Sequence, residues 1–268
     1  MSASRTSRVF LRVATGLTLL FIYFPLVIIA LYAFNGNTSL GWPITSWTTE
    51  WFARAFADEG VRSALILSAQ IAVAATAVAV VLGTLLAFAV QRYSFFGRET
   101  VSFLVILPIA LPGIVTGIAL NSAFRATGIP LGTFTVVVGH ATFCVVTVYN
   151  NAIARLRRTS RSLEEASMDL GADSFQTFRH VTFPAVRSSL VAGSLLALGL
   201  SFDEVIVTTF TAGLQQTLPI WILSNYLRPN QAPLVNVVAV LVVLISVIPI
   251  YLASRLSSDA GNVAPVTR

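Results

Sequence analysis

The 28 residues Ser63–Val90, SALILSAQIAVAATAVAVVLGTLLAFAV, contain no charged side chain. A helix needs about 20 apolar residues to cross the hydrocarbon core of a membrane. Within this stretch, Ala72–Val81 is apolar on every face, whereas a strand of a membrane barrel alternates apolar and polar residues. The segment therefore predicts a membrane-spanning helix, and it indicates an all-α integral membrane protein.

Similar stretches recur along the chain and predict six transmembrane helices in a single transmembrane domain, residues 1–268. Hydrophobic residues make up 56% of the sequence and charged residues 10%, against about 25% charged in a soluble domain. There is too little charge to cover a water-facing globule. The predicted spans are residues 13–34, 63–90, 100–124, 133–154, 188–210 and 234–254.

The arginines predict the orientation of these spans. All 17 basic residues are arginine, and with the N-terminus inside, 13 of them fall on cytoplasmic segments. Basic residues gather on the cytoplasmic side of membrane proteins, so we expect both termini inside. The same bias explains the net charge of +6, and we expect membrane lipid but no nucleic acid as a partner.

The absence of lysine excludes several chemistries. Schiff-base catalysis and the phosphate-binding lysine of a nucleotide-binding loop both need one. With Cys144 as the only cysteine, an intrachain disulfide and a thiolate metal cluster are excluded too. The chain lacks a serine nucleophile elbow and a zinc motif, so we expect no enzyme activity.

The third predicted span carries two prolines. Pro108 and Pro112, followed by Gly113 and Gly117, prevent a regular straight helix. In a membrane, broken backbone survives only where protein or a water-filled cavity satisfies its polar groups. We therefore expect this span in the bundle interior, as a structural kink or as a gate.

The outer segment 35–61 combines three tryptophans, Trp42, Trp47 and Trp51, with a predicted short amphipathic helix. Ser46 precedes this helix, and Glu50 lies in its first turn. Such tryptophans are typical of an interfacial aromatic belt, and they also suit a partner-docking surface.

The longest cytoplasmic segment, the loop 155–187, predicts a helix, a break and a second helix. Ser162 suits the start of the first helix and Gly171 its end. Asp173 or Ser174 suits the start of the second, and Pro184 closes the loop. Two short helices with an apolar face lack a core of their own, so we expect the loop to dock on a cytoplasmic protein.

This loop contains a spaced motif: Glu165-Ala166-Ser167, three residues, Gly171, nine residues and then Val181-x-Phe183-Pro184. The motif resembles the EAA loop of bacterial ABC importer permeases and keeps its spacing, E-A-A-x3-G-x9-I-x-L-P. Serine, valine and phenylalanine replace three family residues and keep their size class or apolar character. The resemblance implies an ATPase-coupling role for residues Glu164, Glu165, Ala166, Ser167, Gly171 and Pro184.

A second pattern comprises Ser201–Gly213, SFDEVIVTTFTAG, then Thr217-Leu-Pro-Ile-Trp221, and the prolines of the third span. This pattern resembles permeases of spermidine/putrescine-type ABC importers. It implies a type I ABC importer permease fold in the bacterial inner membrane. It also implies a second homologous permease in a heterodimer, two cytoplasmic ATPase subunits that hold ATP and Mg, and an extracytoplasmic solute-binding protein. No cofactor is expected in this chain.

Asp203 and Glu204 are the adjacent acids of the fifth predicted span. At 1.5 Å per residue they lie about 22–24 Å from its inner end, and a charge there indicates function. On a continuous helix Glu204 shares its face with Ser201 and Thr208. We interpret these three as a translocation path, with Asp203 touching the partner permease or capping a helix break. The family resemblance makes either acid, Asp203 or Glu204, a candidate path residue in contact with a polyamine. Paired acids bonded to Ser, Thr or a partner arginine are the structural alternative.

Other interpretations stay open. His140 in the fourth span suits a buried hydrogen-bonded histidine better than a metal ligand. The same architecture suits an importer of another small solute, such as an organic anion or an amino-acid derivative. A stand-alone secondary transporter is disfavoured because no internal repeat is evident.

Overall fold

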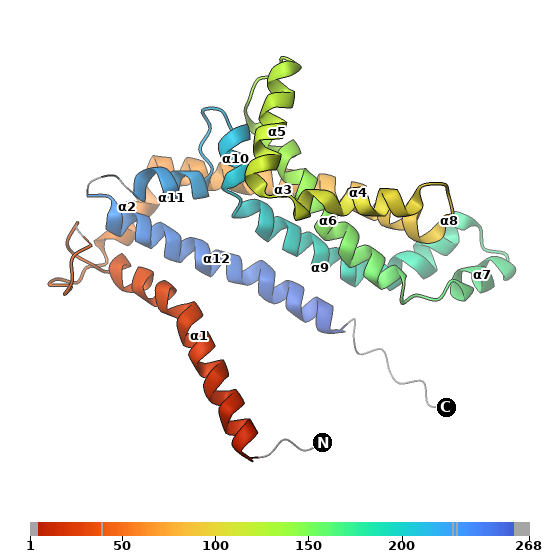
Figure 1. Ribbon diagram of the computed structural model, residues 1–268, viewed down its shortest axis with the longest axis horizontal. Helices are drawn as coiled ribbons and strands as arrows, with labels where there is room; N and C mark the ends of the chain where they lie inside the picture. The colour runs from red at the N-terminus through yellow and green to blue at the C-terminus, as the bar shows by residue number, and fades with distance from the viewer. Residues whose placement is uncertain (1–4, 39, 227, 229, 260–268) are drawn as a thin grey trace. The chain divides into compact units, whose positions relative to one another are not determined.

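The computed structural model describes residues 5–38, 40–226, 228 and 230–259, which form helices and loops with one isolated bridge between Asn35 and Trp47 (Figure 1). The helices are α1 (Arg5–Ala33), α2 (Glu50–Ala57), α3 (Glu59–Arg92), α4 (Arg98–Ala110), α5 (Gly113–Ala126), α6 (Thr133–Leu156), α7 (Ser162–Asp169), α8 (Ser174–Thr177), the π-helical turn η1 (Phe178–Thr182), α9 (Phe183–Phe202), α10 (Ile206–Thr211), α11 (Leu218–Tyr226) and α12 (Ala232–Asp259).

Five helices within the described residues are long and apolar enough to cross a membrane, and the number is six if the bent pair α4 and α5 forms one span. The all-α membrane fold predicted from the sequence is thereby confirmed. Arg268, one of the 13 arginines on segments predicted to be cytoplasmic, lies outside the described residues.

The third predicted span is broken between α4 and α5, whose axes meet at 104°. Figure 1 shows α5 turning sharply away from α4. Leu111, which precedes Pro112, has φ −81° and ψ 143°, because a proline disfavours helical backbone in the residue before it. Pro108 lies inside α4 and does not end it. Since α4 has no buried residue, the prediction that this span lies in the bundle interior is wrong for α4 within the single chain.

The chain divides into two compact units, Met1–Ser63 with Trp221–Ile245, and Ala64–Ile220 with Ser246–Arg268. In the larger unit α6 packs along α9, and the alanines of α3 complete the core (Figure 1). Small residues at helix contacts let backbones approach closely, which is how helices associate in a membrane. The buried core residues are Ala79, Ala87, Val90, Cys144, Val148, Tyr149, Ala152, Ile153, Leu156, Val186, Leu190 and Ala197.

The second helix of the loop 155–187 runs without interruption into the fifth span, as a helical segment Ser174–Phe202. The sequence predicted a separation at Pro184. Instead the helix widens into the turn η1 just before this proline, and the N–H of Phe183 bonds to the carbonyl of Phe178. A proline lacks an N–H and clashes with the preceding helical turn, so a π-turn lets the chain accommodate it while staying helical.

In the smaller unit, the predicted amphipathic helix of the outer segment is present as α2. Glu50 lies in its first turn and forms an ion pair of 2.6 Å with Arg54. Trp51 is buried, and its indole Nε1 donates to the carbonyl oxygen of Asn35 at 2.9 Å. Trp42 and Trp47 are exposed, so they stay available for an aromatic belt or for a docking surface.

Candidate functional site

A second helix break lies at the two acids of the fifth predicted span. α9 ends at Phe202 and α10 begins at Ile206, so the uninterrupted helix that placed Glu204 on one face with Ser201 and Thr208 is not present. Oε1 of Glu204 accepts a hydrogen bond from the N–H of Val207 at 2.9 Å. A carboxylate in this position satisfies a free N–H at a helix start. Glu204 thus caps the start of α10 with its side chain, and Asp203 is the C-cap residue of α9, its N–H bonded to the Gly199 carbonyl at 3.2 Å.

The short helix α10 is fixed between α5 and α6. Its last carbonyls have no partner within the helix; Nδ2 of Asn121 donates to the Phe210 carbonyl at 2.5 Å, and Oγ1 of Thr135 donates to the Thr211 carbonyl at 2.7 Å. The approach of α5 requires a glycine, because a Cβ at Gly117 would lie 2.6 Å from the Phe210 ring. The two broken segments therefore pack on each other.

A cavity of about 180 Å³ lies at these breaks. Glu204 is the only charged residue of its wall. Oγ1 of Thr116 is buried in the same wall without a hydrogen-bond partner. The wall is formed by Pro108, Ile109, Leu111, Gly113, Thr116, Phe143, Leu200, Glu204 and Val207. A carboxylate, an unpartnered hydroxyl and an aromatic ring together suit a small cation.

His140 of α6 joins the two sides of the α9–α10 break. Its Nδ1 lies 2.8 Å from Oγ of Ser201, and its Nε2 lies 2.8 Å from Oγ1 of Thr208. Thr208 has one hydroxyl proton and donates it to the Glu204 carbonyl at 2.8 Å. Toward His140 it therefore accepts, so the neutral imidazole carries its proton on Nε2 and accepts from Ser201 on Nδ1.

The structure divides the predicted path residues into those that bond to His140 and one that lines the cavity. Ser201 and Thr208 lie on either side of one histidine, and their hydroxyls are buried and bonded to His140. Only Glu204 lines the cavity, and Asp203 is exposed. The buried hydrogen-bonded histidine predicted from the sequence is present. Its partners were not predicted, because they lie 61 and 68 residues away along the chain and no local pattern marks them.

The loop 155–187 contains the break that its sequence predicts. α7 ends at Asp169, and Gly171 follows with φ +92°, a left-handed conformation that glycine adopts without steric penalty. Asp173 caps α8 and accepts from the N–H of Gln176 at 2.8 Å. Ser162 is the first residue of α7 rather than its cap, so that part of the prediction is wrong; its N–H instead lies 3.3 Å from Oγ of Ser160.

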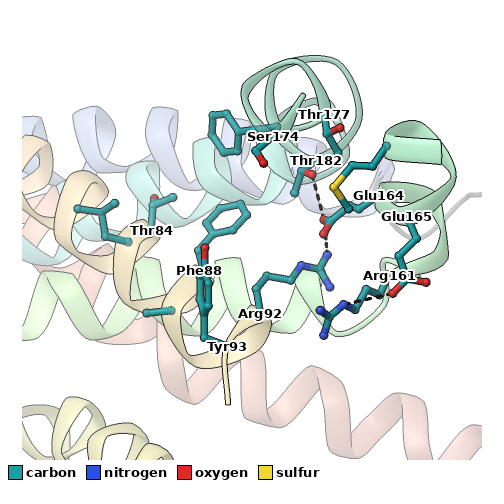
Figure 2. A pocket seen from close by; sticks show the side chains of 14 residues that line it. Thr84, Phe88, Arg92, Tyr93, Arg161, Glu164, Glu165, Ser174, Thr177 and Thr182 are labelled. Atoms are coloured by element: carbon teal, nitrogen blue, oxygen red, sulfur yellow. Dashed lines mark hydrogen bonds and ion pairs between the residues drawn. The ribbon is translucent and has the colours of Figure 1, made fainter. Parts of the chain in front are cut away.

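The two adjacent acids of α7 face different surroundings (Figure 2). Oε1 of Glu164 lies 2.7 Å from Nη2 of Arg92, the last residue of α3, and accepts from Oγ1 of Thr182 at 2.9 Å. Both charged side chains are largely buried, at 12% and 15% exposure. Glu165 pairs with Arg161 at 3.4 Å in the solvent, where both remain more than half exposed. Neither Arg92 nor Thr182 was predicted as a site residue from the sequence.

The exposed surface of the loop 155–187 is apolar. Six large apolar side chains of the loop are exposed: Leu163, Met168, Leu170, Phe175, Phe178 and Phe183. The two ends of the loop are tied together, because Nε of Arg155 donates to the carbonyl of Ala185 at 2.9 Å. A closed loop that presents unburied apolar side chains is typical of an interaction surface.

Fold and site together define a multi-pass helical membrane protein with a carboxylate-lined cavity at two helix breaks and a protruding loop, the features of a membrane transport subunit. The model of the family described as "Binding-protein-dependent transport system inner membrane component" matches residues 79–260. The chain belongs to this family and is a multi-pass inner membrane protein.

Several relatives carry transport names. The chain is 34% identical over 230 residues to the putrescine transport system permease protein PotI of Escherichia coli K12, covering 83% of this chain and 81% of that one. It is 31% identical over 254 residues to the spermidine/putrescine transport system permease protein PotC of Haemophilus influenzae Rd, covering 94% and 98%. These relatives are permease subunits, which are transport components rather than enzymes.

Solved structures support the fold. A bacterial ABC transporter involved in the import of the acidic polysaccharide alginate superposes with a TM-score of 0.71 at 16% identity, covering 97% of this chain and 99% of that one. The MetNI methionine ABC transporter superposes with a TM-score of 0.57 at 20% identity, covering 76% and 99%. The chain therefore has the fold of ABC transporter permeases.

Proposed function

We propose that this chain is the membrane-spanning permease subunit of an ATP-driven importer that moves a polyamine, a spermidine- or putrescine-like cation, delivered by an extracytoplasmic binding protein. A polyamine substrate is supported mainly by sequence similarity to two polyamine permeases over more than four fifths of the chain. The cavity with Glu204 as its only charged residue supports it, because a carboxylate offsets the charge of an ammonium group that has lost water.

Within this proposal Glu204 is the path residue and Asp203 contacts the partner permease. Ser201 and Thr208 hold His140 and thereby fix the backbone that carries Glu204. Thr116 adds a hydroxyl to the cavity wall. One carboxylate gives weak binding, which suits a permease because tight binding would slow release.

The assembly has four further subunits. A second, homologous permease completes the membrane domain, and two ATPase subunits hold ATP and Mg. The binding protein delivers the solute from the other side. The loop 155–187 faces the cytoplasm, and its exposed apolar side chains dock on an ATPase, which transmits ATPase closure to the membrane helices.

The second candidate is an importer of the same architecture for another small solute, an organic anion or an amino-acid derivative. This candidate is supported by the structural neighbours, because transporters named for alginate and for methionine share the fold. Fold therefore does not select the solute, and the residues of the site must.

The test reconstitutes the complete transporter in liposomes and measures ATP hydrolysis with its binding protein loaded from a panel of putrescine, spermidine, an organic anion and amino acids. We expect stimulation of hydrolysis and uptake of the labelled solute with the polyamines alone. Stimulation by a non-polyamine would support the second candidate, and hydrolysis insensitive to every loaded binding protein would contradict both.

A further inference from the structure

The contact between the loop 155–187 and α3 is incomplete. A cavity of about 540 Å³ lies at this contact, and its lining includes Leu85 and Phe88 of α3 and Met168 and Phe178 of the loop. The Phe88 and Phe178 rings meet edge to face with centroids 5.7 Å apart. One aromatic contact beside an open cavity is a weak mechanical link, because unfilled space transmits no displacement.

The ion pair of Glu164 and Arg92 crosses the gap. Thr182, the last residue of η1, donates to the same carboxylate oxygen. The guanidinium is held by charge rather than by aligned hydrogen bonds, since its Nε and Nη2 have no hydrogen-bond partner. Glu164 therefore connects three segments, α7, η1 and the end of α3, at a site with little solvent to screen it.

The exposed pair of Arg161 and Glu165 provides the contrast. It joins two residues of the loop itself, one turn apart, at 3.4 Å in solvent. Such a pair contributes little energy and links the loop to nothing else. Of the two adjacent acids, Glu165 is available to a partner, whereas Glu164 is turned toward the membrane helices.

We propose that Arg92 and Glu164, aligned by Thr182, form a strut that carries movement of the loop 155–187 to α3. The inference rests on the proposed function, in which the loop docks on an ATPase. In this proposal Glu164 is a positioning residue that links the loop to α3 within the permease. Other residues of the loop touch the ATPase. Without the strut, ATPase closure would reach α3 through the Phe88–Phe178 contact and through the core that α3 shares with α6 and α9, with no charged link from α7.

The test uses the reconstituted transporter, with uptake and ATP hydrolysis measured in the same vesicles. Arg92→Gln and Glu164→Gln should each lower uptake by about tenfold while the ATPase subunits still co-purify and hydrolyse ATP, so that more ATP is used per solute molecule. The charge exchange Arg92→Glu with Glu164→Arg should restore the ratio to within about twofold of wild type. Glu99→Gln, which removes an exposed acid from α4, is the matched control and should change nothing.

A second readout does not depend on the solute. Hydrogen exchange should show that binding of the ATPase subunits protects both the loop and residues 84–92 of the wild-type permease. In Glu164→Gln only the loop should remain protected. Equal protection of residues 84–92 in both proteins, or single variants with an unchanged ATP-to-solute ratio, would overturn the strut. Failure of the charge exchange to restore a lowered ratio would also overturn it.

The outcomes separate the two proposals. If polyamines do not stimulate ATP hydrolysis but hydrogen exchange of residues 84–92 changes as expected, the proposed substrate is contradicted and the strut is supported. Absence of any ATPase binding to the wild-type chain contradicts both.

Discussion

The Glu204 side chain has two roles, because it caps a helix and also places a negative charge in the cavity wall. Its Oε1 accepts from the N–H of Val207 and begins α10, while its negative charge faces a cavity whose other lining residues are uncharged. The charge and the cap can be separated by mutation, because a glutamine side chain keeps an acceptor oxygen and loses the charge.

Glu204→Gln should therefore lower polyamine uptake by about tenfold or more, the factor expected for losing a charge-assisted contact of about 1.5–3 kcal/mol. Assembly and thermal stability should stay close to wild type because the helix cap persists. Labelled putrescine uptake by the reconstituted complex measures the effect.

Asp203→Asn is the matched control, since Asp203 neighbours Glu204 but lies outside the cavity wall. We expect a smaller loss of uptake from this variant. If Glu204→Gln transports normally and Asp203→Asn does not, the path residue is Asp203.

At the scale of elements, the two broken spans depend on side chains from other helices. Asn121 and Thr135 satisfy the end of α10, and His140 holds the end of α9 and the middle of α10 at once. Broken helices are tolerated in membranes when neighbours satisfy the freed polar groups in this way. The hydroxyl of Thr208 is central, because it accepts from His140 and donates to the Glu204 carbonyl.

Thr208→Val should destabilise the protein by about 1–3 kcal/mol, because it leaves a buried N–H of His140 and a carbonyl without partners. The midpoint of thermal unfolding of the purified complex should fall by about 2 °C or more. Thr209→Val makes the same change at the next residue, which is exposed and bonds only one turn back along the chain. This control should change stability by about 0.5 kcal/mol or less; equal losses in both variants would show that the His140 contact contributes nothing.

At the scale of the whole molecule, the distribution of arginines predicts which side of the membrane each loop faces. Thirteen of the 17 arginines fall on the segments predicted to be cytoplasmic. The proposed docking of the loop 155–187 on an ATPase requires this orientation. The chain offers a direct test, because its only cysteine, Cys144, is fully buried.

Single cysteines in a Cys144→Ala background should report the orientation. Leu170→Cys lies in the loop 155–187 and Leu214→Cys between α10 and α11, and both leucines are highly exposed. In intact spheroplasts that express the permease without its partners, a membrane-impermeant maleimide should label position 214 and not position 170. Position 170 should become reactive only after permeabilisation; the reverse pattern would invert the orientation and remove the basis for ATPase docking.

How much of this was accessible from the sequence differs from element to element. The spans were predictable because lipid requires about 20 apolar residues in a row, a local property of composition. The end of α7 at Gly171 and the cap at Asp173 were predictable because each is a short-range backbone requirement. Ser162 was not, since Arg161 occupies the cap position and several polar residues there satisfy the same pattern.

The sequence by itself determined that this protein is helical, membrane-embedded and without a nucleotide-binding lysine, and it identified the family through motif spacing. Only the tertiary structure decided which of its few charges act together. The fifth predicted span breaks at Glu204, His140 joins residues more than 60 positions away, and Glu164 turns inward to Arg92. The physical reason is that apolar length and turn chemistry act locally, whereas the partner of a buried polar group is fixed by how separate helices pack.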